Sequence, residues 1–441
     1  MIRRNGIQMK LKTLTCLLFV SGISAAQGLF LTPSEAVAQA LQKNYNVSIA
    51  RNDGLIAKAA NTAGNAGMLP SLDLISSGSL QGTSINQRFS NGLEVNTAGV
   101  RGNQAGASLN LGWTLFDGGR MFINKNSLDE QESNAGMMLR SQMEQTAFDV
   151  LALYFDLLAQ QKQIDASNKA IEFAEEQLAI VSTKVQIGSA SRQEFLQVQI
   201  DLNNAKAAQM LLESTFKAFK IDMNRLMGAD AETNFDVSED DAPDFSKTLD
   251  DLMSRAQGKN ISLLLAQSNV RLQEYNEKSL KAGRFPTLLF NSAFNYNRTS
   301  STAGFALFNQ STGPSAGLGL SWNLFNGSRL NSQIKQVRLQ TENSKLMLDD
   351  TRAQLNAQIR ISYLNYTQFR EIETLRRLNL SLAEENYKLA LDRLRLGGAD
   401  IITVKEAGRS FSQAAADLAL IQSSRRKAEL SLLRLSGELI Q

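Results

Sequence analysis

Carboxylates are almost the only side chains in this sequence that could carry acid–base or metal chemistry. Its 441 residues include 43 Asp and Glu, no His, and a single Cys, Cys16. The sequence therefore lacks the commonest zinc ligands and the imidazole and thiol groups that many enzymes use. A hydrolase could work with carboxylates alone. However, the sequence shows no pair of acidic residues among strands that would line a catalytic cleft. We expect no catalytic residue, no metal and no cofactor.

The first 26 residues have the pattern of a secretory signal peptide. Basic residues come first, a short apolar run follows at 14–20, and small residues lead to Ala26. This order is typical of exported proteins, and the apolar run is too short to span a bilayer as a helix. We expect cleavage after Ala26, which removes residues 1–26, and either Met1 or Met9 could start the signal.

Removal of the signal changes the charge balance of the chain. The whole sequence has a net charge of +3, but four of its 46 basic residues lie in the signal. The mature chain would hold 42 basic and 43 acidic residues, a net charge of −1, and neither Cys nor His. A nearly neutral chain offers no basic surface to attract nucleic acid, so we expect no such partner.

The positions of these charges depend on the elements around them, and those elements come in two copies. Matching segments lie 216 residues apart up to a shared proline and 209 apart after it. The seven-residue difference falls between that proline and a tryptophan, where we expect a loop. The matching pairs are Lys43-Asn44 with Lys259-Asn260, Pro70-Ser71-Leu72 with Pro286-Thr287-Leu288, Trp113–Arg120 with Trp322–Arg329, Gly188 with Gly397, and Arg225–Gly228 with Arg434–Gly437.

Each copy begins with helix and then changes to a two-residue period. Thr32, Pro33 and Glu35 predict a capped helix start, with a break near 44–46 and a helix continuing towards Gly67. Apolar residues then alternate with small or polar ones at 108–115 and 317–324, and their partner strands are expected at 72–80 and 288–296. The Gly-, Ser- and Asn-rich stretches between these strands, 81–106 and 297–315, are predicted to be long exposed loops.

Very long helices follow each pair of strands. Residues 121–187 contain one glycine and no proline, and residues 330–396 contain neither. A helix of that length extends about 100 Å and is typical of coiled coils. The three-four apolar spacing predicts antiparallel hairpins that turn at Gly188 and Gly397. Its members are Phe148, Leu151, Phe155 and Leu158; Leu375, Leu378 and Leu382; Leu212, Phe216, Phe219, Met223 and Leu226; and Ile421, Arg425, Ala428, Leu432 and Leu435, where Arg425 interrupts the apolar series.

These landmarks divide the chain into five parts. They are a signal peptide at 1–26; a first repeat at 27–228, with a β-hairpin at about 69–116 and a helical hairpin at 120–228; an acidic linker in the equatorial region at 229–245; and a second repeat at 246–441, with a β-hairpin at about 286–325 and a helical hairpin at 329–437.

The strand pattern indicates a membrane barrel. One apolar face and one small or polar face match strands that separate lipid from a lumen. A soluble sandwich gives the same alternation, but here only four strands are expected and they lead into long helices. Four strands cannot close a barrel, and no edge can stay unpaired in lipid. Several chains must then share one barrel, and three is the smallest number that leaves an open channel.

The whole pattern resembles the TolC family of outer-membrane factors from Leu31 to Gly437. The features that carry the resemblance are the signal, the Pro-Leu-led hairpins, the Leu-Phe-Asp/Asn-Gly-x-Arg exits and the glycine turns, the last three occurring twice. The resemblance implies a mainly α protein with membrane β structure: a homotrimer with a twelve-stranded β-barrel in outer-membrane lipid, continued by a long helical coiled-coil barrel. It also implies a periplasmic adaptor protein and an inner-membrane RND or ABC transporter as partners.

The family's functional positions transfer to three groups of residues. The adaptor-contact tips would be Ile187, Gly188 and Ser189 with Leu396, Gly397 and Gly398. The periplasmic aperture would comprise Glu194, Thr403 and Glu406, with Asp400 and Lys405 nearby. The barrel-to-helix junction would comprise Trp113, Phe116 and Gly118 with Trp322, Phe325 and Gly327. The Tyr and Arg of the family's closing lock are replaced here by Leu394 and Ala399, so we hypothesise a weaker acidic ring at Glu406 and Glu194.

One alternative stays open beside an outer-membrane exit duct, and the cargo of the duct is open as well. A periplasmic coiled-coil structural or adhesion protein would share the signal and the helices but leaves the Trp-bearing strands unexplained. The exported cargo is not encoded in any motif, so drug efflux and type I protein secretion are equal alternatives.

Overall fold

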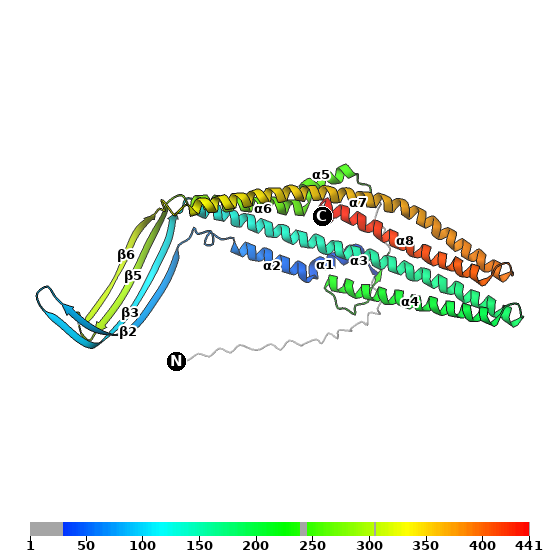
Figure 1. Ribbon diagram of the computed structural model, residues 1–441, viewed down its shortest axis with the longest axis horizontal. Coiled ribbons are helices and arrows are strands. Elements are labelled where there is room, and N and C mark those ends of the chain that lie inside the picture. The colour runs from blue at the N-terminus through cyan, green and yellow to red at the C-terminus, as the bar shows by residue number, and fades with distance from the viewer. Residues whose placement is uncertain (1–29, 239–244, 304–305, 441) are drawn as a thin grey trace, which may run out of the picture.

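The computed structural model describes residues 30–238, 245–303 and 306–440. The predicted signal peptide, with Cys16, and part of the predicted linker lie outside these residues. The molecule is long and narrow, with a curved sheet at one end and helical hairpins reaching to the other (Figure 1). Among the described helices, none combines the length and apolarity needed to cross a bilayer.

A short helix and a longer one open each copy, separated by a capping asparagine. In the first copy these are α1 (Pro33–Lys43) and α2 (Tyr45–Ala60), and in the second α5 (Leu249–Lys259) and α6 (Ile261–Ala282). The predicted Thr32–Glu35 capping box is present. Asn44 and Asn260 each cap the following helix and donate from Nδ2 to a carbonyl oxygen near the end of the same copy, at 2.8 and 3.0 Å. The break near residue 44 is confirmed, but α2 ends at Ala60 instead of continuing towards Gly67.

The four long strands form one antiparallel sheet in the order β2-β3-β5-β6. Their bounds are β2 (Ser71–Arg88), β3 (Glu94–Phe116), β5 (Thr287–Ser301) and β6 (Phe308–Ser321). The prediction of long loops at 81–106 and 297–315 is therefore wrong. Small residues such as Ser77, opposite Gly106, pair across the ladder, because neighbouring strands outweigh weak intrinsic preference. The seven extra residues of the first copy lengthen its strands and not a loop.

β6 is shorter at its C-terminal end than the alternation of residues predicted. That strand stops at Ser321, so Trp322 and Leu324 lie beyond it, although alternation predicted a strand over 317–324. In the first copy the equivalent Trp113 is inside β3, which continues to Phe116. The two copies thus differ in how far their exit strands are paired.

The helical hairpins agree closely with expectation. They consist of α3 (Arg120–Gln186) with α4 (Arg192–Met227), and α7 (Arg329–Arg395) with α8 (Ile401–Leu435). Near the sheet, neighbouring helices follow the order α2-α3-α6-α7, the same order as the strands that they adjoin. Towards the tips the order is α4-α3-α8-α7, so α2 and α4 form one edge of the layer and α7 the other (Figure 1).

Part of the predicted linker is structured and helps to close the middle of the molecule. β4 (Asp236–Val237) pairs in parallel with β1 (Phe30–Leu31). The buried Tyr154 hydroxyl lies 2.7 Å from the carbonyl oxygen of Leu31 and 2.8 Å from that of Ser238. The prediction of a wholly solvated linker is therefore wrong, because the first half of the linker pairs with β1.

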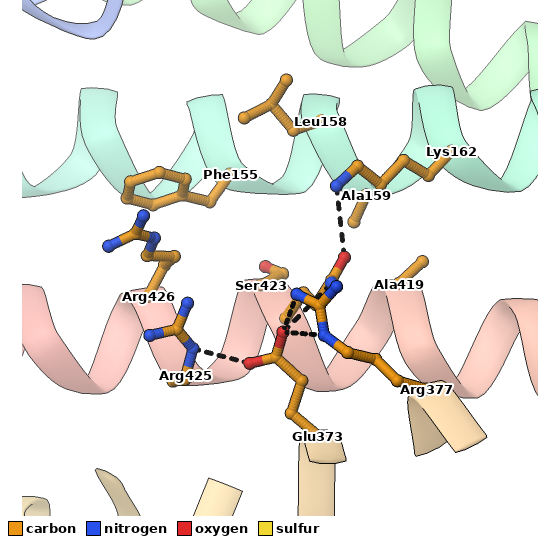
Figure 2. Close-up of a pocket in the computed structure, with 11 residues that line it drawn as sticks. Phe155, Leu158, Ala159, Lys162, Glu373, Arg377, Ala419, Ser423, Arg425 and Arg426 are labelled. Carbon is orange, nitrogen blue, oxygen red and sulfur yellow. Dashed lines mark hydrogen bonds and ion pairs between the residues drawn. The ribbon is translucent and has the colours of Figure 1, made fainter. Parts of the chain in front are cut away.

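A charged cluster interrupts the apolar series of α8 at Arg425. Arg425 Nε lies 2.7 Å from Glu373 Oε2 on α7, and Arg377 Nη2 donates to Glu373 Oε1 at 2.6 Å. Figure 2 shows these groups beside a cavity of about 310 Å³ between α3, α7 and α8. Burial raises the pKa of Glu373, but hydrogen bonds from Arg377 and Gln422 and the nearby guanidinium charges outweigh it and lower the pKa. Arg425 therefore replaces an apolar residue at this position of the series, because it pairs with the carboxylate of Glu373.

Another predicted stripe, on α7, stays exposed among the residues that the structure describes. Leu375, Leu378 and Leu382 are 62%, 55% and 54% exposed on α7. Their spacing continues at Ile361, Leu364 and Leu389, which are also exposed. This three-four stripe lies on the free edge of the layer and not in the seam of the hairpin.

Candidate functional site

Both hairpin tips turn through the same glycine motif. Gly188 and Gly397 have φ of +77° and +81°, a left-handed conformation that glycine adopts without strain. The following residue in each copy donates its N–H to a carbonyl five residues back, Ser189 to Lys184 and Gly398 to Arg393, both at 2.8 Å. These bonds satisfy the last carbonyls of α3 and α7. They leave Ile187 and Leu396 exposed at the end of the molecule.

The returning helices are capped by acids that were predicted for the aperture or placed near it. Glu194 completes a capping box, accepting from Ser191 N at 2.5 Å while Ser191 Oγ accepts from Glu194 N. Asp400 caps α8 and accepts from both the N–H and the hydroxyl of Thr403. These hydrogen bonds, from Ser191 and from Thr403 respectively, lower the pKa of Glu194 and of Asp400. Both carboxylates therefore help to start a helix, whatever they do in a channel.

Contacts between the two tips join the hairpins. A cavity of about 790 Å³ lies between them and is lined by Ile187, Glu194 and Leu396, among others. Lys184 Nζ donates to the carbonyl oxygen of Leu394, and Arg395 pairs with Glu176 on α3. These residues escaped the sequence analysis because charges on long helices have many possible partners until the helices are aligned in space.

A further ion pair joins the returning helices. Lys405 Nζ on α8 lies 2.8 Å from Asp201 Oδ1 on α4. Glu406, the next residue, is exposed and has no hydrogen-bond or ion-pair partner in the part of the chain that the structure describes. Glu194 shares the tip cavity, whereas Thr403 and Glu406 do not line it. Of the predicted aperture residues, Glu194 and Thr403 thus take part in helix capping. The carboxylate of Glu406 is left without a partner among the described residues.

The predicted junction residues meet the turns that lead into the sheet. Trp113 Nε1 donates to the carbonyl oxygen of Met68, and Trp322 Nε1 to that of Arg284, both at 3.0 Å. Gly118 has a φ of +75°, and a Cβ there would stand 2.4 Å from the carbonyl oxygen of Ala282. Gly327 has a φ of +66° but open space around it.

Two exposed phenylalanines complete this junction. Phe116 ends β3, and Phe325 lies just beyond β6. Each belongs to the exit segment of its own copy and leaves its ring accessible. Within the described ranges, no group of three or more His, Cys, Asp or Glu residues is placed to hold a metal ion.

A protomer with four strands at one end and two helical hairpins at the other has the fold of an outer-membrane channel subunit. The CmeC outer membrane channel of Campylobacter jejuni matches it with a TM-score of 0.78 at 16% identity, over 93% of this chain and 86% of that one. VceC of Vibrio cholerae matches with a TM-score of 0.72 at 15% identity, over 92% and 96%. The chain belongs to the outer membrane efflux protein family, whose sequence model matches residues 36–229 and 252–438.

A closer relative in sequence covers less of the chain. The outer membrane efflux protein BepC of Brucella suis is 27% identical over 198 residues. That alignment spans 44% of this chain and 41% of BepC. Family membership and fold thus confirm the resemblance drawn from the duplicated motifs.

Proposed function

We propose that this chain is one subunit of a trimeric exit duct in the outer membrane. The duct is passive, and it serves a tripartite efflux pump or a type I secretion system. The observation that carries the proposal is a curved layer with two open edges, each of which needs a partner. The four strands of one chain supply a third of a twelve-stranded barrel, and the helical hairpins supply a third of a tunnel across the periplasm.

Both edges of the layer carry unpaired groups. β2 and β6 are the outer strands of the sheet, so each has one side whose backbone groups lack a ladder partner among the described strands. Such edges are not tolerated in lipid, and pairing β2 of one chain with β6 of the next satisfies both.

The helices that continue from the sheet also expose apolar residues at both edges of the layer. The α7 stripe of Leu375, Leu378 and Leu382 is exposed on one edge. Apolar residues of α4 are exposed on the other edge, and they include Ile200, Met210 and Leu211. Exposed apolar residues on opposite edges of one layer bury each other when copies stand side by side. Closing the ring therefore requires no other protein.

The exposed tips are the surface for a periplasmic adaptor. Ile187, Gly188 and Ser189 at one tip and Leu396, Gly397 and Gly398 at the other present backbone turns of the same shape. The adaptor in turn binds an inner-membrane RND or ABC transporter, which supplies the energy that a passive duct lacks.

In this proposal, contacts between the two hairpins near their tips close the aperture. Lys184, which bonds to the Leu394 carbonyl, and the Arg395–Glu176 pair tie the hairpins where the family's Tyr and Arg are missing. The free carboxylate of Glu406 makes an acidic ring with its copies, with Glu194 and Thr403 beside it. Cations then pass more readily than anions because three carboxylates attract them.

Fractionation and single-channel recording test the proposal. The protein should be extracted by detergent from outer membranes as a trimer, and it should conduct ions in planar bilayers. Glu406→Ala should reduce the cation preference, measured as a reversal potential in a salt gradient, while Glu342→Ala, an exposed acid of α7 outside the leucine stripe, should leave it unchanged. An unchanged preference in Glu406→Ala removes the ring but not the duct. A soluble periplasmic monomer would contradict the duct and favour the alternative, a coiled-coil structural or adhesion protein.

A further inference from the structure

Three arginines gather where the second hairpin leaves the sheet. Arg120 at the start of α3, Arg284 after α6 and Arg329 at the start of α7 line one cavity of about 550 Å³. Trp322 and Phe325 line the same cavity. A cavity that combines guanidinium groups with exposed aromatic rings suits a ligand that has an anionic part and an apolar part.

The positive charges of this cavity are not neutralised by any residue that the structure describes. None of the three guanidinium groups has an ion-pair partner among residues 30–238, 245–303 and 306–440. Arg284 Nη2 donates only to the neutral Oδ1 of Asn331, at 3.1 Å, within those ranges. The neighbouring Glu277 is paired with Lys281 at 2.7 Å. Like charges held together without an acid repel one another, so an external anion would stabilise the cluster.

The first copy shows what the second has changed. At the positions equivalent to Arg284 and Asn326 it has Met68 and Asp117. Asp117 Oδ2 accepts from the N–H of Met121 at 2.9 Å, so the first junction contains its own carboxylate. The second junction has gained a cation and lost that acid. The arginine cluster is therefore not a general result of the fold, because both copies share the fold and only the second junction has the cluster.

The cavity lies at the boundary of the apolar outer face of the sheet. Trp113 follows Leu109 and Leu111 on that face of β3, and Trp322 makes the equivalent indole hydrogen bond in the second copy. Aromatic residues at the end of an apolar strand face mark the depth of lipid headgroups. An anion with an apolar part at that depth is a phospholipid.

We propose that Arg120, Arg284 and Arg329 bind the phosphate of an anionic phospholipid headgroup at the helix-side rim of the barrel. This inference rests on the proposed function, because it needs the sheet to stand in a membrane. The planar guanidinium groups bind phosphate oxygens in pairs, and Trp322 and Phe325 contact the upper acyl chains. One such site per subunit gives three around the barrel.

Thermal unfolding of the purified full-length channel in mixed micelles tests this binding. Phosphatidylglycerol should raise the midpoint of the wild type by roughly 2–4 °C above its value in phosphatidylcholine. The double variant Arg284→Met/Arg329→Gln should lose that rise. The matched control Arg360→Gln, an exposed α7 arginine far below the junction, should keep it. Inorganic phosphate alone should produce no rise, because it lacks the acyl chains.

Several results would overturn the inference. They are an equal rise with phosphatidylcholine, a rise with inorganic phosphate alone, or a rise that persists in the double variant. Native mass spectrometry of the wild type, titrated with equal amounts of phosphatidylglycerol and phosphatidylcholine, needs no variant and should retain the former selectively. Equal retention contradicts the site. Conductance of the same preparation reports on the duct separately, so a conducting channel without lipid preference rejects the lipid site alone.

Discussion

The two copies of the unit share a backbone but solve one packing problem in different ways. Where α4 places Phe216 against α3, α8 places Arg425 against a buried glutamate of α7. The side chain of Glu373 is 6% exposed and that of Arg425 is 13% exposed. The first copy relies on apolar burial at this level, and the second on a network of charges.

This difference separates the features that the duplication requires from those that can vary. Both copies keep the capping asparagines, the junction tryptophans and the tip glycines, all of which set the direction of the backbone. Side chains that fill space between helices are free to change, provided that a new partner appears with them. Four predictions test this contrast between residues that set the direction of the backbone and side chains that fill the space between helices.

The largest effect is expected at the charged seam of the second copy. Glu373→Ala should destabilise the protein by about 3 kcal/mol, because it removes the shared partner of Arg377 and Arg425. This value is at the low end for a buried ion pair, because Glu429 still lies 2.8 Å from Arg425 in the variant. The measurement is the midpoint of unfolding followed by helical circular dichroism in detergent. The double variant Glu373→Leu/Arg425→Phe imitates the first copy and should recover most of the loss. A single variant as stable as the wild type would mean that the network adds nothing.

A smaller and equal effect is expected where both copies bring backbones close together. Gly228 and Gly437 have positive φ, and a Cβ on each would stand 2.6 Å and 2.4 Å from the carbonyl oxygens of Lys43 and Lys259. Alanine at either position should cost about 1–3 kcal/mol in the same unfolding measurement. Gly188→Ala, with positive φ but open surroundings, is the matched control and should cost less. Unequal losses at Gly228 and Gly437 would break the equivalence of the copies.

The indole hydrogen bonds should contribute less again. Trp113→Phe and Trp322→Phe should each lower stability by about 1 kcal/mol, because each removes one N–H donor to a backbone carbonyl. Hydrogen exchange of the turns before β2 and β5 should rise locally in the respective variant. A change confined to Trp113 would indicate that only the copy with the longer paired strand uses this bond.

The smallest effect concerns pH at the tips. The capping hydrogen bonds lower the folded-state pKa of Glu194 and of Asp400 below the ordinary values of 4.5 and 3.8. Their contribution is therefore present above those values and is lost as the pH falls through the lower folded values. Amide exchange at the starts of α4 and α8, corrected for intrinsic rates, should increase in acid. Glu194→Gln should remove the pH dependence at the α4 tip only.

Much of the architecture follows from the sequence because backbone direction depends on a few residue types. Glycine turns, capping residues and proline-free stretches located the helical hairpins to within a few residues. The strand lengths were underestimated, since pairing with a neighbour holds Gly- and Ser-rich segments extended when their composition alone suggests loops. At Trp322 the strand length was overestimated, because apolar and polar residues continue to alternate beyond Ser321, where β6 ends.

The contacts of the site were harder to predict. Arg395 with Glu176 and Lys405 with Asp201 join elements that are distant in sequence, and many charged residues on these helices could have paired instead. The exposed Leu375 stripe was recognised as a seam, but whether its partner is the same chain or another depends on the curvature of the layer. The arginines around Trp322 come from three segments, and only the fold brings them together.

The matching turns at Gly188 and Gly397 have a consequence for stoichiometry. In the proposed trimer the rim would show six loops of nearly the same backbone shape, arranged with pseudo-sixfold symmetry. The loops alternate in chemistry, because Ser189 and Ser191 in one kind correspond to Gly398 and Asp400 in the other. A partner that recognises shape alone would count six equivalent places, whereas one that recognises the side chains would count three.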